Sequence, residues 1–269
     1  MAIPRGVAFL TSALAASAAL AGGALPGQAR AQAAPPAQPA IHAIAPDTEP
    51  AITAAPKGNT APLAGTAVAV SAASDRWAES LAAFAAADQA HPPKPGGVLF
   101  VGSSSIRLWN DLETEFQSLP VVVKRGFGGS RMLDCARHLH QLVEPYKPRL
   151  VLVYAGDNDL AEGRTPEQVL QAFSAFVEGV RQTLPATRIA YISIKPSPSR
   201  AGLMPEIRQA NALIQAYTLK TRNTDFIDIY TPMLDAAGQP RAELFREDLL
   251  HLNARGYALW KQVITAHLN

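Results

Sequence analysis

The sequence predicts an α/β protein, a three-layer α/β/α sandwich around a five-stranded parallel sheet. Five short apolar runs alternate with helix-like blocks between Val98 and His267. Nearly continuous apolarity is typical of strands that are buried on both faces. Strands that alternate with helices favour parallel pairing with right-handed crossovers. The chain has 269 residues, which suffices for one large domain, and it shows no internal repeat and no second domain.

Residues 1–33 are predicted to be a secretory signal peptide. Arg5 provides a positive start, Val7–Leu25 is uncharged and rich in Ala and Leu, and small-x-small cleavage patterns lie between Ala29 and Ala33. An uncleaved membrane anchor is the alternative, because this run is just long enough to span a bilayer, although its glycines and alanines make it weakly hydrophobic. We expect a secreted or periplasmic protein without stable membrane insertion after cleavage.

Residues 34–71 are predicted to form a disordered linker. They are rich in Pro, Ala, Thr and Gly and show neither a helical nor a strand period. The folded domain is therefore expected to comprise residues 72–269.

Charge and cysteine content narrow the possible functions. The chain has 24 Lys and Arg against 22 Asp and Glu, and Arg5 and Arg30 belong to the expected signal peptide. The remaining charges balance, so there is no electrostatic argument for a nucleic-acid or anionic-membrane partner. Cys135 is the single cysteine, which excludes an internal disulfide. Its position in a predicted helix favours packing as a small hydrophobic residue.

The expected elements follow in order along the chain. Trp77, Leu81 and Phe84 have helical spacing between Asp75 and Gln89, and the His-Pro-Pro that follows ends this helix. The strands are expected at Val98–Gly102, Val121–Lys124, Leu150–Tyr154, Arg188–Ile194 and Phe226–Ile229. The helices after these strands are expected at Ile106–Phe116, Met132–Val143, Pro166–Leu184 (capped by Thr165), Pro205–Thr221 and Ala254–His267.

Three serines directly follow the first predicted strand, after Gly102. Open α/β sheets bind their ligands at the carboxyl ends of the strands, which is where Ser103, Ser104 and Ser105 fall. A serine in this position is most often an ordinary helix cap. To act as a nucleophile, its hydroxyl needs a base that removes the proton and donors that bind the resulting oxyanion.

Later stretches contain residues that could supply those partners. Gly126–Gly129 follows the second strand, and its backbone could approach a ligand closely or simply form a tight turn. Asn158 follows the third strand and could donate to an oxyanion or make an Asx-turn. Asp248 and His251, three positions apart, could pair so that the imidazole acts as base, although a lone histidine there is usually a surface residue.

Several other kinds of site do not fit the sequence. It contains no spacing typical of zinc or calcium ligands, no phosphate-binding loop and no complete dinucleotide fingerprint. The Gly-x-Ser-x-Gly elbow of α/β-hydrolases and the Ser-x-x-Lys pair are also absent. We therefore expect neither a metal nor a cofactor.

The ordered set Gly102-Ser103-Ser104, Gly126–Gly129, Gly156–Asp159 and Asp248-x-x-His251 resembles the blocks of the SGNH (GDSL-type) hydrolase superfamily. The resemblance covers about Gly96 to Trp260. It implies a flavodoxin-like sheet of order 2-1-3-4-5 and ester hydrolysis without a cofactor.

The resemblance also implies a role for each matching residue. Ser104 would be the nucleophile, His251 the base and Asp248 the carboxylate that orients it. The oxyanion hole would consist of the backbone N–H groups of Ser104 and Gly129 and the side-chain amide of Asn158. Ser103 stands where the family usually has Asp, and three adjacent serines leave the attacking one open. Ser103 and Ser105 are expected to make local turn and cap hydrogen bonds.

The function that follows from these residues is that of an exported serine ester hydrolase. The segments Gly102–Trp109 and Lys195–Arg200, the second of which follows the fourth strand, also resemble lysophospholipase-like and acetylhydrolase-like members of the family. A carbohydrate O-deacetylase acting on a polysaccharide is the alternative within the enzyme class. A non-catalytic glycan-binding relative is the alternative outside it. The sequence leaves acyl specificity and oligomeric state open.

Overall fold

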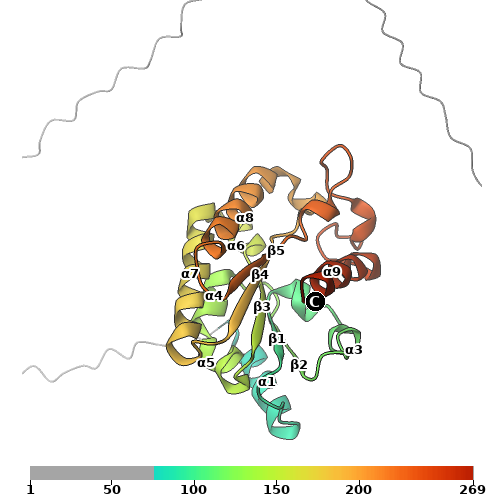
Figure 1. The fold of residues 1–269 in the computed structure, drawn as a ribbon. Helices are drawn as coiled ribbons and strands as arrows, with labels where there is room; N and C mark the ends of the chain where they lie inside the picture. The colour runs from blue at the N-terminus through green and yellow to red at the C-terminus, as the bar shows by residue number, and fades with distance from the viewer. Residues whose placement is uncertain (1–75, 269) are drawn as a thin grey trace, which may run out of the picture. The chain divides into compact units, whose positions relative to one another are not determined.

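Five parallel strands form the central sheet of the fold (Figure 1). The computed structural model describes residues 76–268, so the expected signal peptide and linker lie outside the described residues. The strands are β1 (Val98–Gly102), β2 (Val122–Gly126), β3 (Leu150–Tyr154), β4 (Arg188–Ile192) and β5 (Thr224–Ile227). Their order is β2-β1-β3-β4-β5, and every pairing is parallel. The predicted fold class and strand order are thereby confirmed.

Helices cover both faces of this sheet (Figure 1). The described helices are α1 (Ala78–Ala90), α2 (Ser104–Arg107), α3 (Leu112–Glu115), α4 (Met132–Arg137), α5 (Leu139–Leu142), α6 (Asp157–Ala161), α7 (Pro166–Thr183), α8 (Met204–Thr218) and α9 (Ala254–Leu268). Short 3-10 helices occur at Glu144–Tyr146, Pro198–Leu203, Thr231–Met233 and Ala242–Leu244. Within residues 76–268, no helix combines the length and apolarity needed to cross a bilayer.

The sheet separates two hydrophobic cores because alternate strand residues point to opposite faces. Leu99 and Val101 of β1 pack on one face, with side chains of α1, α4, α5, α7 and α8. Val98 and Phe100 pack on the other face, with side chains of α2, α3 and α9. All five residues of β1 and of β3 are buried, which explains why these strands read as continuous apolar runs.

The single helix expected at Ile106–Phe116 is wrong. The structure has two helices of four residues there, α2 and α3. Trp109 lies between them and is 1% exposed. Its ring contacts those of Phe100, Phe116, Tyr257 and Trp260. A continuous helix conflicts with this burial, because the chain turns inward at Trp109 to join the aromatic cluster.

One further helix prediction needs correction, and one short helix was not predicted. The segment predicted as one helix at Met132–Val143 breaks at His138, which leaves helical geometry between α4 and α5. The stretch after β3, considered as a turn or a cap, contains the five-residue helix α6. Helices this short do not develop the apolar period that identifies longer ones.

Two local predictions are confirmed. Thr165 caps α7, and its side chain accepts a hydrogen bond of 3.3 Å from the Gln168 backbone N–H. Cys135 lies in α4 and is fully buried among core residues.

Two glycines hold the carboxyl ends of β1 and β2 close to their neighbours. Gly102 has φ +154°, and a Cβ there would lie 2.0 Å from the carbonyl oxygen of Tyr154. Gly126 pairs with Gly102 across the sheet, and its Cβ would lie 2.2 Å from the backbone nitrogen of Arg107. Because neither position has room for a side chain, α2 starts directly at the edge of the sheet.

Candidate active site

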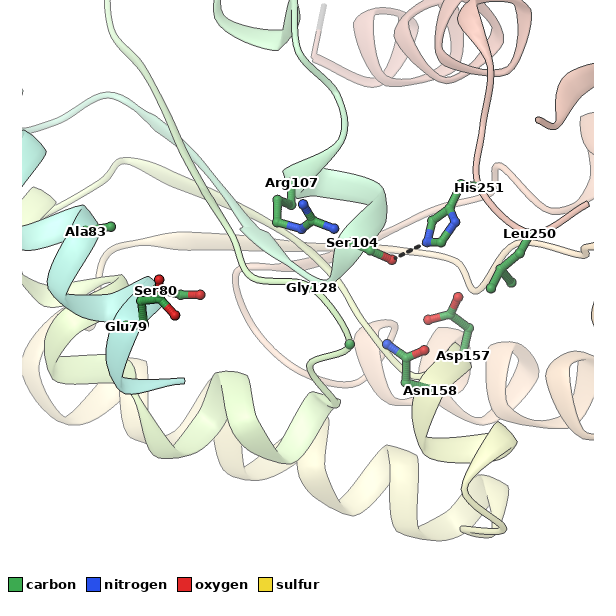
Figure 2. Close-up of a pocket in the computed structure, with 11 residues that line it drawn as sticks. Glu79, Ser80, Ala83, Ser104, Arg107, Gly128, Asp157, Asn158, Leu250 and His251 are labelled. Carbon is green, nitrogen blue, oxygen red and sulfur yellow. Dashed lines mark hydrogen bonds between the residues drawn. The ribbon is translucent and has the colours of Figure 1, made fainter. Parts of the chain in front are cut away.

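Ser104 is the first residue of α2, two residues beyond the end of β1. Its hydroxyl oxygen lies 3.0 Å from Nε2 of His251 (Figure 2). His251 comes from the loop that precedes α9, so this contact brings the first strand and the last loop of the domain together. The distance is within hydrogen-bonding range of a serine and a base.

Asp248 holds the ring of His251 from the other side. Its Oδ2 lies 2.6 Å from Nδ1 of His251, and its Oδ1 accepts hydrogen bonds from the backbone N–H groups of Leu250 and His251. Burial by itself raises the pKa of Asp248, but the hydrogen bonds from the His251 ring and from these two N–H groups outweigh it. The pKa of Asp248 is thereby lowered to about 2. The carboxylate therefore stays ionised beside the imidazole.

The three adjacent serines differ in accessibility. Ser103 is 0% exposed and Ser105 is 1% exposed, whereas Ser104 is partly exposed and contacts His251. Ser103 caps α2 through its backbone carbonyl, which accepts from the N–H groups of Ile106 and Arg107, and its side chain makes no cap hydrogen bond. The expectation that the Ser103 hydroxyl makes a cap bond is wrong, because its oxygen is buried and has no hydrogen-bond partner among residues 76–268.

Three potential oxyanion donors line the cleft beside Ser104. Gly129 has φ +76°, in the left-handed region, and lies in the loop after β2. Within residues 76–268, the backbone N–H groups of Gly129 and Ser104 donate to no protein acceptor. Asn158 donates one side-chain N–H to the Ser130 carbonyl at 3.0 Å. Its second N–H remains for a ligand in the cleft.

Two basic residues behind Asn158 were not identified as site residues from the sequence. Arg200 donates to Asn158 Oδ1 at 3.0 Å, and Lys195 forms an ion pair of 2.7 Å with Asp157. Both lie in the stretch Lys195–Arg200 that follows β4, to whose individual residues the sequence assigned no role. The signal for them in the sequence is the resemblance of this stretch to lysophospholipase-like and acetylhydrolase-like members of the family.

The cleft has a volume of about 660 Å³ and is lined by residues from early and late parts of the sequence, from Glu79 in α1 to His251 before α9. In Figure 2, Ser104, Arg107 and His251 lie on one side of it and Glu79 and Ser80 of α1 on the other. Asn158 and Asp157 lie below Ser104 in this view. The structure thus brings the five residues selected from the sequence, Ser104, Gly129, Asn158, Asp248 and His251, to one region.

Comparison with known proteins agrees with this fold. The model of the GDSL-like lipase/acylhydrolase family matches residues 100–259, and the chain belongs to this family. A search of curated proteins finds no match.

Several solved structures share the fold. A GDSL-like lipase from Bacteroides thetaiotaomicron is 21% identical with TM-score 0.60, and the match covers 70% of this chain and 96% of that one. A Streptococcus pneumonia protein, provisionally described as a platelet activating factor, is 20% identical with TM-score 0.64, and the match covers 71% of this chain and 92% of that one. A catalytic mutant of an acetylxylan esterase from Geobacillus stearothermophilus is 14% identical with TM-score 0.56, and the match covers 65% of this chain and 95% of that one.

Proposed function

We propose that this acylhydrolase cleaves carboxylic esters through Ser104, His251 and Asp248. The observation that carries the proposal is the continuous chain of contacts from Asp248 Oδ2 through the His251 ring to Ser104 Oγ, at 2.6 Å and 3.0 Å. An aspartate on one imidazole nitrogen and a serine on the other is the arrangement that turns a hydroxyl into a nucleophile.

In the first half of the reaction, Ser104 Oγ attacks the ester carbonyl carbon while His251 Nε2 takes the hydroxyl proton. The carbonyl oxygen becomes an oxyanion and accepts hydrogen bonds from the Ser104 and Gly129 N–H groups and from the Asn158 amide. The C–O bond to the alcohol then breaks, and the imidazolium returns its proton to the leaving oxygen. Asp248 stabilises the imidazolium in this interval.

In the second half, water hydrolyses the acyl-serine ester. His251 takes a proton from the attacking water, and the same three donors bind the second oxyanion. Collapse of this intermediate releases the carboxylic acid, and the proton returns from His251 to Ser104 Oγ. The cycle balances without a cofactor.

The lining of the cleft supports a small acyl group on a polar alcohol. Glu79, Ser80, Arg107 and Asn158 offer hydrogen-bonding groups, while Ala83 and Leu250 are its apolar side chains. A deep apolar pocket is what a long acyl chain needs to leave water. A carbohydrate O-deacetylase is the second candidate that this polar lining favours, and acetylxylan esterase is the name given to one protein of similar fold.

The test is hydrolysis of p-nitrophenyl esters of increasing chain length by the wild type and by Ser104→Ala. We expect the variant to lose more than about 1,000-fold in kcat and to keep the wild-type circular dichroism spectrum. Ser103→Ala serves as the matched control, since Ser103 is buried next to the proposed nucleophile. Full activity of Ser104→Ala would contradict the proposal, and loss in Ser103→Ala instead would move the nucleophile.

A fluorophosphonate probe distinguishes an enzyme from a binding protein of the same fold. We expect one covalent adduct on the wild type, located at Ser104 by peptide mass spectrometry, and none on Ser104→Ala. An unlabelled wild type would favour the non-catalytic glycan-binding alternative. Acetylated xylan and acetylated peptidoglycan, assayed for released acetate, then separate the deacetylase from an esterase of small molecules.

We also propose that residues 1–33 direct export and are removed, so that the mature protein acts outside the cytoplasm. The charge and apolar pattern of this segment support it. Amino-terminal sequencing of the protein recovered from periplasm and medium tests it, and a mature chain that still begins at Met1 would contradict it.

A further inference from the structure

A buried ionic cluster lies directly behind Asn158. Arg200 in the 3-10 helix Pro198–Leu203 donates from Nη2 to Asn158 Oδ1 at 3.0 Å, and its Nη1 lies 3.2 Å from Asp157 Oδ2. Lys195 Nζ lies 2.7 Å from the same Asp157 oxygen and 3.1 Å from the Tyr154 hydroxyl. The side chains of Lys195, Asp157 and Arg200 are 1%, 6% and 17% exposed.

This cluster carries an excess of positive charge. Two cations, Lys195 and Arg200, share the single carboxylate of Asp157, and no other acidic group in residues 76–268 forms an ion pair with either of them. Burying a net charge is costly unless it has a compensating interaction. The excess lies next to the amide that faces the cleft, where an oxyanion develops in the proposed reaction.

Both ends of the Asn158 amide are fixed by hydrogen bonds. Ser130 accepts from Nδ2 at 3.0 Å, and Arg200 donates to Oδ1 at 3.0 Å. The oxygen and nitrogen of an asparagine side chain are nearly equal in size, so an unrestrained amide can turn its oxygen toward the cleft. An oxygen in that place would repel the oxyanion, whereas the N–H donates to it.

We propose that Arg200 is a positioning residue for Asn158, holding its amide with the N–H toward the oxyanion and strengthening that donor. The inference rests on the proposed esterase function. A cationic hydrogen bond at Oδ1 withdraws electron density from the amide, which makes the remaining N–H a better donor. Arg200 touches neither the serine nor the oxyanion in this scheme and acts through Asn158.

The same segment also contacts the loop of the proposed base. The Ser199 backbone N–H donates to the carbonyl of Leu249 at 3.1 Å, in the turn between Asp248 and His251. Leu249 has φ +53°, which is uncommon for a residue with a side chain. One short 3-10 segment thus holds the oxyanion amide through Arg200 and the base loop through its backbone.

The decisive experiment is a double-mutant cycle on p-nitrophenyl acetate hydrolysis with Arg200→Met and Asn158→Ala. We expect Arg200→Met alone to lower kcat about tenfold with KM within twofold, and Asn158→Ala to lower kcat about 100-fold. In the Asn158→Ala background, we expect Arg200→Met to change kcat by less than twofold, because the group through which Arg200 acts is gone.

Equal losses in both backgrounds would overturn the inference, as would an effect confined to KM or no effect in the wild-type background. Asp157 keeps its 2.7 Å partner Lys195 in Arg200→Met, so the variant does not leave a lone buried carboxylate. Should Arg200→Met lower the thermal midpoint below the assay temperature, Arg200→Lys replaces it in the same cycle. Lysine keeps the charge but not the two-pronged geometry, so Arg200→Lys is expected to lower kcat by between about twofold and tenfold with Asn158 present and by less than about twofold in the Asn158→Ala background.

Arg188→Met is the matched control. Arg188 also pairs with an aspartate, Asp225 at 2.7 Å, but it starts β4 at the opposite end of the strands. We expect it to leave kcat within twofold of the wild type. A wild type that hydrolyses no ester contradicts the proposed function, whereas additive losses in an active wild type contradict only the role of Arg200.

Discussion

His251 Nε2 lies 3.0 Å from Ser104 Oγ, although 147 positions separate the two residues in the chain. The serine is fixed by β1 and α2, and the histidine by a turn that Asp248 closes with two hydrogen bonds from backbone N–H groups. Two segments far apart in the sequence therefore meet at this contact. Replacing the side chain of Ser104, Asp248 or His251 should therefore lower turnover more than it lowers stability.

Replacing Asp248 with Asn tests the orientation of the base. An amide cannot stabilise the imidazolium and can present its N–H to Nδ1, which favours the wrong tautomer of His251. We expect kcat for p-nitrophenyl acetate to fall by about 1,000-fold to 10,000-fold. Unchanged turnover would show that Asp248 does not orient the base.

The stability difference between the wild type and Asp248→Asn should also depend on pH in acid. Because the pKa of Asp248 is lowered to about 2 in the folded state, its ionised form stabilises the fold above the ordinary aspartate pKa. That stabilisation is lost as the pH falls toward 2, so the stability difference between wild type and Asp248→Asn should shrink over this range. Asp248 is 47% exposed, so the difference is expected to be small. Chemical denaturation from pH 2 to pH 6 measures it.

Gly102→Ala is expected to be strongly destabilising. The added Cβ would lie 2.0 Å from the Tyr154 carbonyl oxygen, and φ +154° strains any other residue. We expect a loss of about 3 kcal/mol in the free energy of unfolding. Gly163→Ala is the control, because Gly163 has φ +83° but a Cβ added there would meet no atom within 4 Å. Urea unfolding compares the two, and equal losses would contradict the steric argument.

Asp159 gives the fold a pH dependence of the opposite sign. Its side chain is buried and accepts a 3.0 Å hydrogen bond from the Met132 N–H. Burial raises the pKa of Asp159 to about 6. Because this folded-state pKa lies above the unfolded value, the contribution of Asp159 to the free energy of unfolding is largest below about pH 4 and falls as the pH rises through 6.

Asp159→Asn should abolish this part of the pH dependence. We expect the free energy of unfolding of the wild type to fall by about 2 kcal/mol relative to that of the variant between pH 4 and pH 7, because this window covers most of a pKa shift of about two units. Thermal unfolding of both proteins across this range checks it, since the other titrating groups cancel in the difference. A pH-independent difference would contradict a buried carboxyl that titrates near 6.

Cys135 should be unreactive in the folded protein. It is fully buried in α4, and burial, together with the nearby Asp159 and Asp134, raises the pKa of its thiol well above the ordinary value. Thiolates rather than thiols attack disulfide reagents. We expect less than one-tenth of the reaction rate with Ellman's reagent that the urea-unfolded chain shows. Cys135→Ala should keep its esterase activity, and rapid labelling of the native chain would contradict the burial.

The strands were predictable because their signal is local. β1 and β3 were predicted to the residue. Both are apolar runs, and a glycine ends β1 and lies two residues after the last residue of β3. The prediction of one helix at Ile106–Phe116 is wrong because the ring of Trp109 packs into an aromatic cluster that includes Trp260, far away in the sequence, and α2 ends before Trp109. Apolar spacing alone does not distinguish a residue on a helix face from one that ends the helix.

Some residues of the candidate site were also predictable from local motifs, and others were not. The blocks around Ser104, Gly129 and Asn158 were visible as short motifs after strands, and the block around His251 as the pair Asp248-x-x-His251 before the last helix. The contact of Arg200 with Asn158 was not visible, because the two residues lie 42 positions apart and the stretch Lys195–Arg200 does not indicate which of its side chains meets the site.

The sequence by itself determined the five strands to within two residues at each end, their parallel pairing and a set of candidate site residues. It could do so because apolar runs, turn glycines and short polar motifs act over a few neighbouring positions. Only the tertiary structure decided that Ser104, and not Ser103 or Ser105, faces His251, and that Arg200 holds the amide of Asn158. Which way a side chain points, and which distant group it meets, depends on how the helices pack against the sheet.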